Sequence, residues 1–177
     1  MKLLDLKIAA AQRKRIPGVV NPDLSTGKGT RKLGIILDSE DSELRDCFLN
    51  LKAEMGIGDL DFHIVTCKDK TAKNDIFHGP VFTKKDISWS GKIKNGEVDL
   101  FLENQYHLVI CFAEDDNKLA LLLVSLCAAA LKVGRASMEE GVEDSVFDLS
   151  ISASSAEPQI FIEELKKYLK IIKKQVG

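Results

Sequence analysis

The chain of 177 residues has no excess of basic residues, no Cys-x-x-Cys pair and no apolar run long enough to cross a membrane. Its 25 Lys and Arg against 27 Asp and Glu give a formal net charge of -2. No global field would therefore draw it to nucleic acid or to an anionic bilayer. The longest apolar run, residues 119–131, falls short of the roughly 20 residues that a transmembrane helix requires. We expect a soluble, cytoplasmic protein that binds no nucleic acid and has no membrane span.

The cysteines and the first residues support the same location. Four cysteines lie far apart, each in an apolar run, at Cys47, Cys67, Cys111 and Cys127. No histidine stands at metal-ligand spacing from them, so they are interpreted as reduced core residues. The start MKLLDLKIAAAQRKR has charges inside its apolar part and basic residues after it, the reverse of a secretory signal peptide.

Glycine is also missing where a phosphate-binding loop needs it. The first expected strand ends at Leu37 and continues into DSEDS, whereas a dinucleotide-binding turn places glycines there. The GKGT at residues 27–30 has a glycine between its lysine and threonine, and no strand precedes it, which excludes a P-loop. His63, His78 and His107 show no catalytic-triad spacing, and Trp89 is expected to be a core residue within a solvated, lysine-rich surface.

What the sequence does contain is an N-terminal segment followed by one α/β domain. Residues 2–15 are rich in helix formers and end in basic residues, which predicts an isolated helix. Residues 16–31 concentrate Pro, Gly, Asn, Asp, Ser and Thr and indicate a linker arm. We therefore divide the chain into an N-terminal helix and arm, 1–31, and a single domain, 32–177, whose 45% hydrophobic content across the chain suffices for one core.

Within the domain, short apolar runs alternate with amphipathic segments. The patterns predict strands at 32–37, 61–67, 106–112, 132–135 and 146–151, and helices at 44–55, 97–102, 117–130 and 157–174. Residues 68–95 indicate one or two short strands whose pairing the sequence does not determine. This alternation predicts a three-layer α/β sandwich with a Rossmann-like or flavodoxin-like, mostly parallel sheet.

Loops that leave the carboxyl ends of parallel strands meet at one edge of the sheet, where α/β proteins bind ligands. The candidate ligand-binding residues in these loops are Asp38, Ser39, Ser42, Asn117, Gly134 and Arg135. No cofactor motif is evident. Carboxylates from two loops would suit a hard cation such as Mg²⁺, and the candidate metal ligands are Asp38, Asp115 and Asp116.

Each of these candidates also has a purely structural interpretation. Acidic and hydroxylic residues before a helix cap its amino end, which contributes roughly 0.3 to 2 kcal/mol. Capping accounts for Asp41, Ser42, Asp115 and Asp116 without a ligand. Arg135 either binds an anion or pairs with the acidic residues near it.

Several segments resemble known families. The stretches KLGIILDSEDSELRDCF, YHLVICFAEDDNKLALLLVSLCAAALKVGR, FDLSISAS and FIEELKKYL resemble a family of small bacterial proteins common in Bacteroidota, which has no established activity. Residues 106–135, with a strand ending in an acidic residue, an apolar helix and Lys-Val-Gly-Arg, are also similar to the amino-terminal half of lipopolysaccharide heptosyltransferases. That second resemblance implies a Rossmann-like topology.

Two classes of function remain open. The first, which we favour, is a non-catalytic binding or assembly domain whose N-terminal helix docks on a protein partner or on a second copy of the chain. The second is a small-ligand enzyme acting on a phosphorylated or glycosyl substrate, with Asp38, Asp115 and Asp116 around a metal and Arg135 on the anion. The sequence does not decide whether the protein is an enzyme.

Overall fold

The computed structural model describes residues 3–15, 31–139 and 145–176. Five α-helices and six strands follow one another along these residues, with short 3-10 helices at Asp59–Asp61, Lys84–Asp86 and Ala136–Glu139. The strands are β1 Leu33–Leu37, β2 Phe62–Cys67, β3 Val81–Phe82, β4 Gln105–Phe112, β5 Ala128–Arg135 and β6 Leu149–Ile151. The α-helices are α1 Leu3–Lys14, α2 Ser42–Glu54, α3 Gly96–Glu103, α4 Lys118–Leu126 and α5 Pro158–Val176.

All six strands are parallel and lie in the order β3-β2-β1-β4-β5-β6. This is the order of a doubly wound Rossmann-type sheet. Every residue of β1 is buried, as expected for a central strand covered on both faces. After β1 the chain forms β2 and β3 on one side of β1, and it then forms β4, β5 and β6 on the other side. The topological switch point, at which the strand order reverses, therefore lies between β1 and β4.

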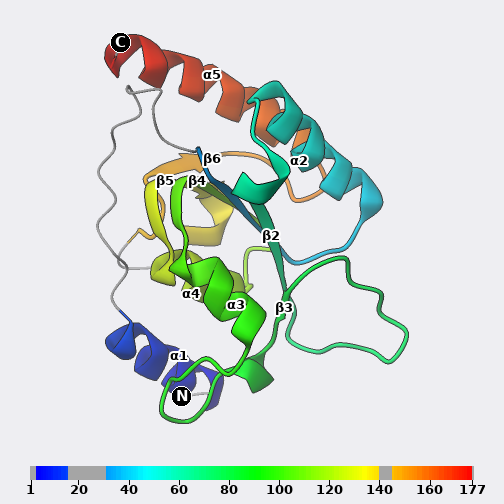
Figure 1. Ribbon diagram of the computed structural model, residues 1–177, viewed down its shortest axis with the longest axis vertical. Coiled ribbons are helices and arrows are strands. Elements are labelled where there is room, and N and C mark those ends of the chain that lie inside the picture. The colour runs from blue at the N-terminus through cyan, green and yellow to red at the C-terminus, as the bar shows by residue number, and fades with distance from the viewer. Residues whose placement is uncertain (1–2, 16–30, 140–144, 177) are drawn as a thin grey trace.

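Helices cover both faces of this sheet (Figure 1). Helices α2 and α5 share one hydrophobic cluster with sheet residues such as Ile35 and Ile110. Helices α1, α3 and α4 share the other cluster with residues such as Ile36 and Val109. Neighbouring residues in a strand point to opposite faces, so β1, β2, β4 and β5 each supply both clusters. The predicted three-layer α/β sandwich with a parallel sheet is confirmed.

One predicted boundary is wrong. We expected a helix over 117–130, but α4 ends at Leu126 and β5 already begins at Ala128. The backbone N–H of Cys127 closes the helix on the carbonyls of Leu123 and Val124. Ala128 then pairs with Gln105 on β4. Alanine favours helix by propensity, but pairing with β4 overrides that preference here.

The strand expected over 146–151 is shorter than predicted. Only Leu149–Ile151 pairs with β5 as a strand. Just before this strand, Asp148 makes two hydrogen bonds to the backbone of Lys132. The Asp148 carboxylate accepts from the Lys132 backbone N–H, at 2.7 Å, and the Asp148 backbone N–H donates to the Lys132 carbonyl, at 2.8 Å. The ring of Phe147 instead packs over Gly134, where an added Cβ would lie 2.2 Å from the ring.

The N-terminal helix exists, but it is not isolated from the domain. Leu4 and Ile8 of α1 pack against the cluster that contains α4, and Ala11 is buried. Gly91, at φ +79°, approaches the α1 backbone so closely that a Cβ there would lie 2.3 Å from Ala10. The linker arm at 16–30 lies outside the described residues, and the division at residue 31 stays a prediction.

Residues 68–95 contain one short strand and one bridge. β3 pairs with Thr66 and Cys67, and Ile87 forms an antiparallel bridge with Ile93. Both isoleucines are buried, whereas Trp89 between them is 66% exposed. The expected core position of Trp89 is therefore wrong, because the tryptophan lies in the turn that the two isoleucines anchor.

The prediction that the cysteines are core residues is confirmed for three of the four. Cys67, Cys111 and Cys127 are buried and Cys47 is partly buried, all as free thiols. Burial raises the pKa of all four thiols.

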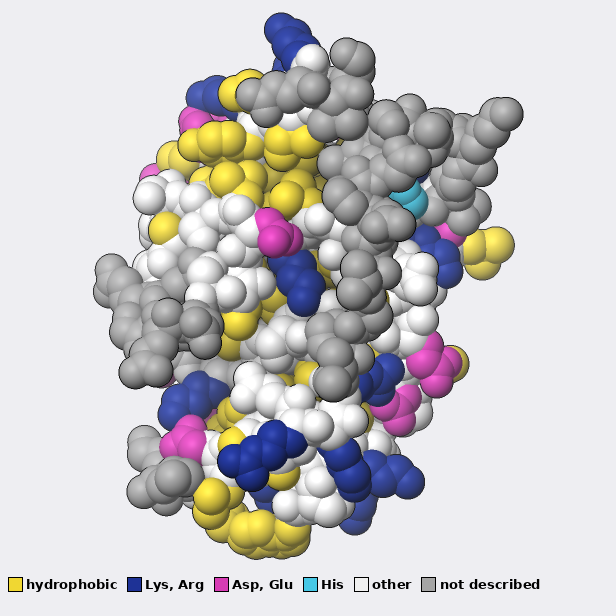
Figure 2. Space-filling view, turned by 90° about the vertical axis from the view of Figure 1, so that its left-hand side faces the viewer, with side chains coloured by type: hydrophobic (Ala, Val, Ile, Leu, Met, Phe, Trp, Pro, Cys, Tyr) yellow, Lys and Arg dark blue, Asp and Glu magenta, His cyan; other side chains and the backbone are white. Residues whose placement is uncertain are grey.

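No helix in the described part of the chain is long and apolar enough to span a bilayer. Figure 2 shows hydrophobic side chains gathered at both ends of one face, near α5 at the top and near α1 at the bottom.

Candidate functional site

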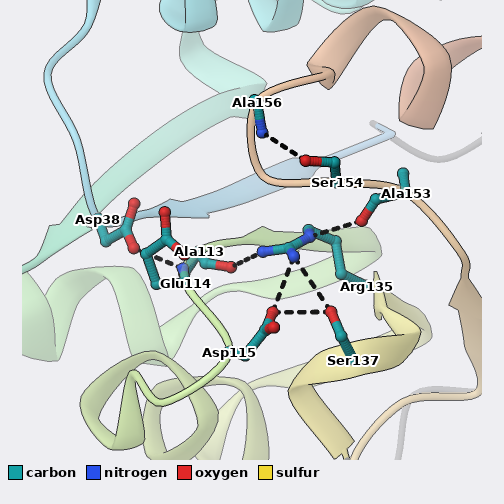
Figure 3. A network of polar contacts seen from close by, with 9 residues as sticks. All are labelled: Asp38, Ala113, Glu114, Asp115, Arg135, Ser137, Ala153, Ser154 and Ala156. Atoms are coloured by element: carbon teal, nitrogen blue, oxygen red, sulfur yellow. Dashed lines mark hydrogen bonds and ion pairs between the residues drawn. The ribbon is translucent and has the colours of Figure 1, made fainter.

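The candidate site lies at the switch point, where the chain leaves β1 and β4 side by side. Leu37 and Phe112 are register partners at the ends of these strands, and Asp38 and Ala113–Glu114 follow them. The carboxylate of Asp38 accepts a hydrogen bond from the backbone N–H of Glu114, at 2.5 Å (Figure 3). The two loops are thus tied together at the crevice where α/β sheets bind ligands.

Asp38 is the titratable group that the fold perturbs at this point. Its partial burial raises the pKa of the carboxyl, and the neighbouring Glu114 carboxylate raises it further. Hydrogen bonds from the Glu114 backbone and the Asn117 side chain act in the opposite direction but do not cancel the rise. A perturbed carboxyl at a crevice is a feature of functional sites.

Two hollows open on either side of Asp38 and Glu114. The first hollow has a volume of about 580 Å³ and lies between the start of α1, the end of β2 and the start of α4. Its lining includes the carboxylates of Asp5, Asp38, Asp69, Glu114 and Asp116 and the ammonium groups of Lys68, Lys70 and Lys118. Charges of both signs therefore face one volume.

The second hollow is smaller, about 260 Å³, and lies between the starts of α2 and α5. Its charged lining residues, among those that the structure describes, are all acidic: Asp38, Asp41, Glu43 and Glu114. Asp38 and Glu114 thus line both hollows, and the second one disfavours an anionic ligand.

Arg135 is used inside the fold rather than offered to a ligand. Its side chain is only 4% exposed. The guanidinium donates to the carbonyls of Ala153, at 3.0 Å, and Ala113, at 2.6 Å, and to the hydroxyl of Ser137, at 3.1 Å (Figure 3). It also pairs with Asp115 at 2.8 Å. The interpretation of Arg135 as a partner of nearby acids is confirmed, and the arginine lines neither hollow.

The three candidate metal ligands have separate surroundings. Asp115 is held by Arg135 and by the Ser137 hydroxyl, which donates to it at 2.7 Å. Asp38 and Asp116 both line the first hollow. Across residues 3–15, 31–139 and 145–176, no group of three His, Cys, Asp or Glu side chains is placed to hold a metal ion. A magnesium site at these three residues stays a prediction.

The remaining predicted residues serve the helix starts. Asp41 caps α2 by accepting from the backbone N–H groups of Glu43 and Leu44, which confirms its capping role. Ser39 accepts from the Asp41 N–H and lines the second hollow. Ser42 is the first residue of α2.

On the other side of the site, Asn117 rather than Asp115 or Asp116 caps α4. Its side-chain oxygen accepts from the Ala120 N–H, at 3.0 Å, while its amide donates to the Cys67 carbonyl, at 3.1 Å. Asn117 also lines the first hollow. Gly134 lies beneath the Phe147 ring and lines neither of the two hollows.

Of the residues that line the first hollow, the sequence predicted only Asp38, Asp116 and Asn117 as site residues. Lys68 and Lys70 directly follow a correctly predicted strand, so their place at the carboxyl edge could have been inferred. Glu114 lies in the same loop as the predicted Asp115 and Asp116, but it is not among the predicted ligands. Asp5 could not be placed, because nothing in the sequence says that α1 folds back to the start of α4, where Asp5 pairs with Lys118 at 2.6 Å.

Comparisons with known proteins give a family but no activity. No curated protein matches the chain. No solved structure matches it either. A family model, described as a family of unknown function (DUF6913), matches residues 6–172, which include most of α1 and the whole sheet. The chain belongs to this family of unknown function, DUF6913.

Proposed function

We propose that the protein is a non-catalytic binding domain that takes a small polar ligand in the first hollow. The observation that carries this proposal is the position of the hollow at the switch point, next to the perturbed Asp38. Its volume of about 580 Å³ falls within the range of roughly 300 to 1,000 Å³ that ligand pockets occupy.

The charges of the hollow favour a ligand that carries an amino group. Asp38 and Glu114 line the hollow and would accept hydrogen bonds from an ammonium group. Lys68 and Lys70 line it as well and would accommodate one anionic group of the same ligand. A purely anionic ligand would meet more carboxylates than ammonium groups. Amino acids, polyamines and amino sugars are therefore the first classes to test.

Binding without catalysis is favoured by how the reactive side chains are used. The Arg135 guanidinium is bound by four internal partners. The thiols of Cys67 and Cys111 are buried, and their raised pKa keeps them protonated and weakly nucleophilic. These groups therefore stabilise the fold around the hollow and are not placed to take part in a reaction.

The test compares wild type with two variants that lose one carboxylate each. Asp38→Asn removes the charge of a carboxylate that lines both hollows, and Asp46→Asn removes an exposed charge on α2 outside both hollows. A panel of amino acids, polyamines, amino sugars and nucleotide-sugars is screened by thermal shift, and each hit is titrated by calorimetry. We expect a hit whose affinity falls at least about tenfold in Asp38→Asn and stays unchanged in Asp46→Asn. Hits that bind both variants equally, or a panel without hits, would refute the proposal.

The second candidate is a small-ligand enzyme with Asp38 as a proton donor or acceptor. The raised pKa of this carboxyl is the observation that favours it. Each hit from the panel is incubated with wild type and followed by NMR. Conversion that disappears in Asp38→Asn while binding persists would establish the enzyme and exclude the non-catalytic domain. If wild type leaves every ligand unchanged, the enzyme hypothesis is excluded.

Assembly through the N-terminal helix is a separate prediction. The inner face of α1 is occupied by its own domain, so only its outer residues remain for a partner, and these include Leu3 and Leu6, 55% and 49% exposed. Sedimentation of wild type and Leu6→Lys tests whether this face mediates self-association. Equal masses at all concentrations would exclude a role for Leu6 in self-association.

A further inference from the structure

The edge of the sheet at β2 is only partly covered. β3 is two residues long and pairs with Thr66 and Cys67. Among the described residues, no strand pairs with Phe62–Val65 on this side. The N–H of Thr66 points outward, donating to the Pro80 carbonyl at 3.0 Å. Peptide groups two residues apart in a strand point the same way, so the N–H of Ile64 points to the same open side.

A groove runs along this open edge. It has a volume of about 480 Å³ and lies between α2 and α3, with residues 78–80 at one end. Leu49 of α2 and Leu100 of α3 line the groove from the two helices, and Leu100 is 63% exposed. At the closed end, a Cβ added to Gly79 would lie 3.5 Å from the Ile64 carbonyl oxygen.

The β2 residues that line the groove are Phe62, His63 and Ile64, and the charged side chains of Arg45 and Glu97 line it as well. Phe62 and Ile64 face one side of the sheet, and the ring of His63 faces the other, against Tyr106. Burial and the nearby Lys32 charge lower the pKa of His63, while Asp61 and the Leu60 backbone partly oppose the shift. The lowered pKa favours the neutral form of the ring, which suits an apolar neighbour.

We propose that this edge groove binds a short extended segment of a partner protein, which adds a strand beside Phe62–Val65. Main-chain hydrogen bonds to the open peptide groups would supply affinity, and alternate side chains would supply specificity. Because successive side chains of a strand point to opposite faces, two consecutive apolar residues would contact Leu49 and Leu100. The partner motif is thus an extended segment with an apolar pair.

A second copy of the chain fits the groove less well. The open stretch of four residues is about 13 Å long. A contact of that length buries far less than the roughly 1,200 Å² that a stable interface between folded proteins requires. A second copy would also bring its own α2 and α3, which flank its β2 in the same way and would meet these helices first. A single extended segment avoids both obstacles.

The test uses the full chain and a displayed library of random linear peptides. Enriched peptides are synthesised and titrated by calorimetry against wild type, Leu100→Glu, Gly79→Leu and Ile171→Glu. The first two variants change the wall and fill the closed end, while Ile171→Glu places the same charge at an exposed apolar position of α5. Gly79 has no positive φ, so a side chain there is tolerated.

We expect peptides with an apolar pair to bind wild type and Ile171→Glu alike, and to bind both groove variants at least about tenfold more weakly. Hydrogen exchange of the Ile64 amide should slow when the peptide is bound. The proposal is overturned if no sequence is enriched, or if the groove variants bind as wild type does. Protection of the Ile64 amide by rising protein concentration alone would identify a second copy as the occupant instead.

Discussion

The two halves of the carboxyl edge carry similar side chains but use them in opposite ways. At the ends of β1 and β4, Asp38 and Glu114 face two hollows. At the end of β5, Arg135 binds the surrounding backbone and pairs with Asp115 from the loop after β4. We call these the open rim and the closed rim. The difference teaches that a charged residue at a strand end is a ligand candidate only if the fold leaves its bonding groups free.

The closed rim is explained by the geometry of a guanidinium. It offers five donors in a plane, and here they reach two carbonyls, a hydroxyl and a carboxylate from segments far apart in sequence. Arg135 therefore joins the loop after β4 to the loop after β6. On the open rim, a single hydrogen bond joins Asp38 to Glu114, and both side chains remain at the surface of the hollows.

The largest expected effect comes from removing the centre of the closed rim. Arg135→Ala would leave the carbonyls of Ala113 and Ala153 without their donor and remove packing on Phe112. Because buried unsatisfied groups are costly, we expect a loss of about 2 to 5 kcal/mol in the free energy of unfolding, measured by urea denaturation. Its control, Asp115→Asn, changes a half-exposed partner and should cost no more than about 1 kcal/mol. Equal losses in both variants would mean that the ion pair, not the backbone contacts, holds the rim.

A medium effect is expected at Gly134. In Gly134→Ala the new Cβ would lie within 2.5 Å of three atoms of the Phe147 ring, so the ring must shift. Overpacking of this kind costs about 1 to 3 kcal/mol. The double variant Gly134→Ala/Phe147→Leu should be less destabilised than the sum of its single changes, as measured in a double-mutant cycle. Additive losses would show that the ring does not confine this glycine.

The smallest stability effect, with the opposite sign, is expected on the open rim. Burial raises the pKa of Asp38 above its ordinary value of 3.8, so its neutral form is favoured in the folded state. Its contribution is fully present below pH 3.8 and is lost as the pH rises through the higher folded value. Asp38→Asn keeps an acceptor for the Glu114 N–H and cannot ionise.

The measurement is the free energy of unfolding of wild type and Asp38→Asn between pH 3 and pH 7. We expect wild type to lose stability relative to Asp38→Asn as the pH rises over this interval. A wild type that becomes relatively more stable would show that Asp38 is held as a favourable anion. Asp38 would then resemble Asp115 of the closed rim, whose charge is stabilised by partners within the protein.

The central strands could be predicted because their sequence pattern is local. Residues 33–37 are apolar throughout and are flanked by polar residues, as a strand buried on both faces requires. The start of β5 could not be predicted in the same way. Ala128 and its neighbours favour helix as isolated residues, and only the open side of β4 makes them a strand.

The candidate site was predicted in position but not in composition. Asp38 and Asn117 were expected at the edge, and both line the first hollow. Arg135 was placed at the same edge, yet its role depends on the carbonyl of Ala153, which lies 18 residues further along the chain. Asp5 entered the site because α1 packs on α4. No local pattern encodes either of these long-range contacts.

The sequence by itself determined the alternation of strands and helices, and with it a parallel sheet whose loops converge on one edge. Hydrophobic periodicity and helix capping act within a few residues, so they can be inferred from the chain alone. Only the tertiary structure decided which charges on that edge are free and which are neutralised. That outcome depends on hydrogen bonds and burial between distant segments, as the contrast between Asp38 and Arg135 shows.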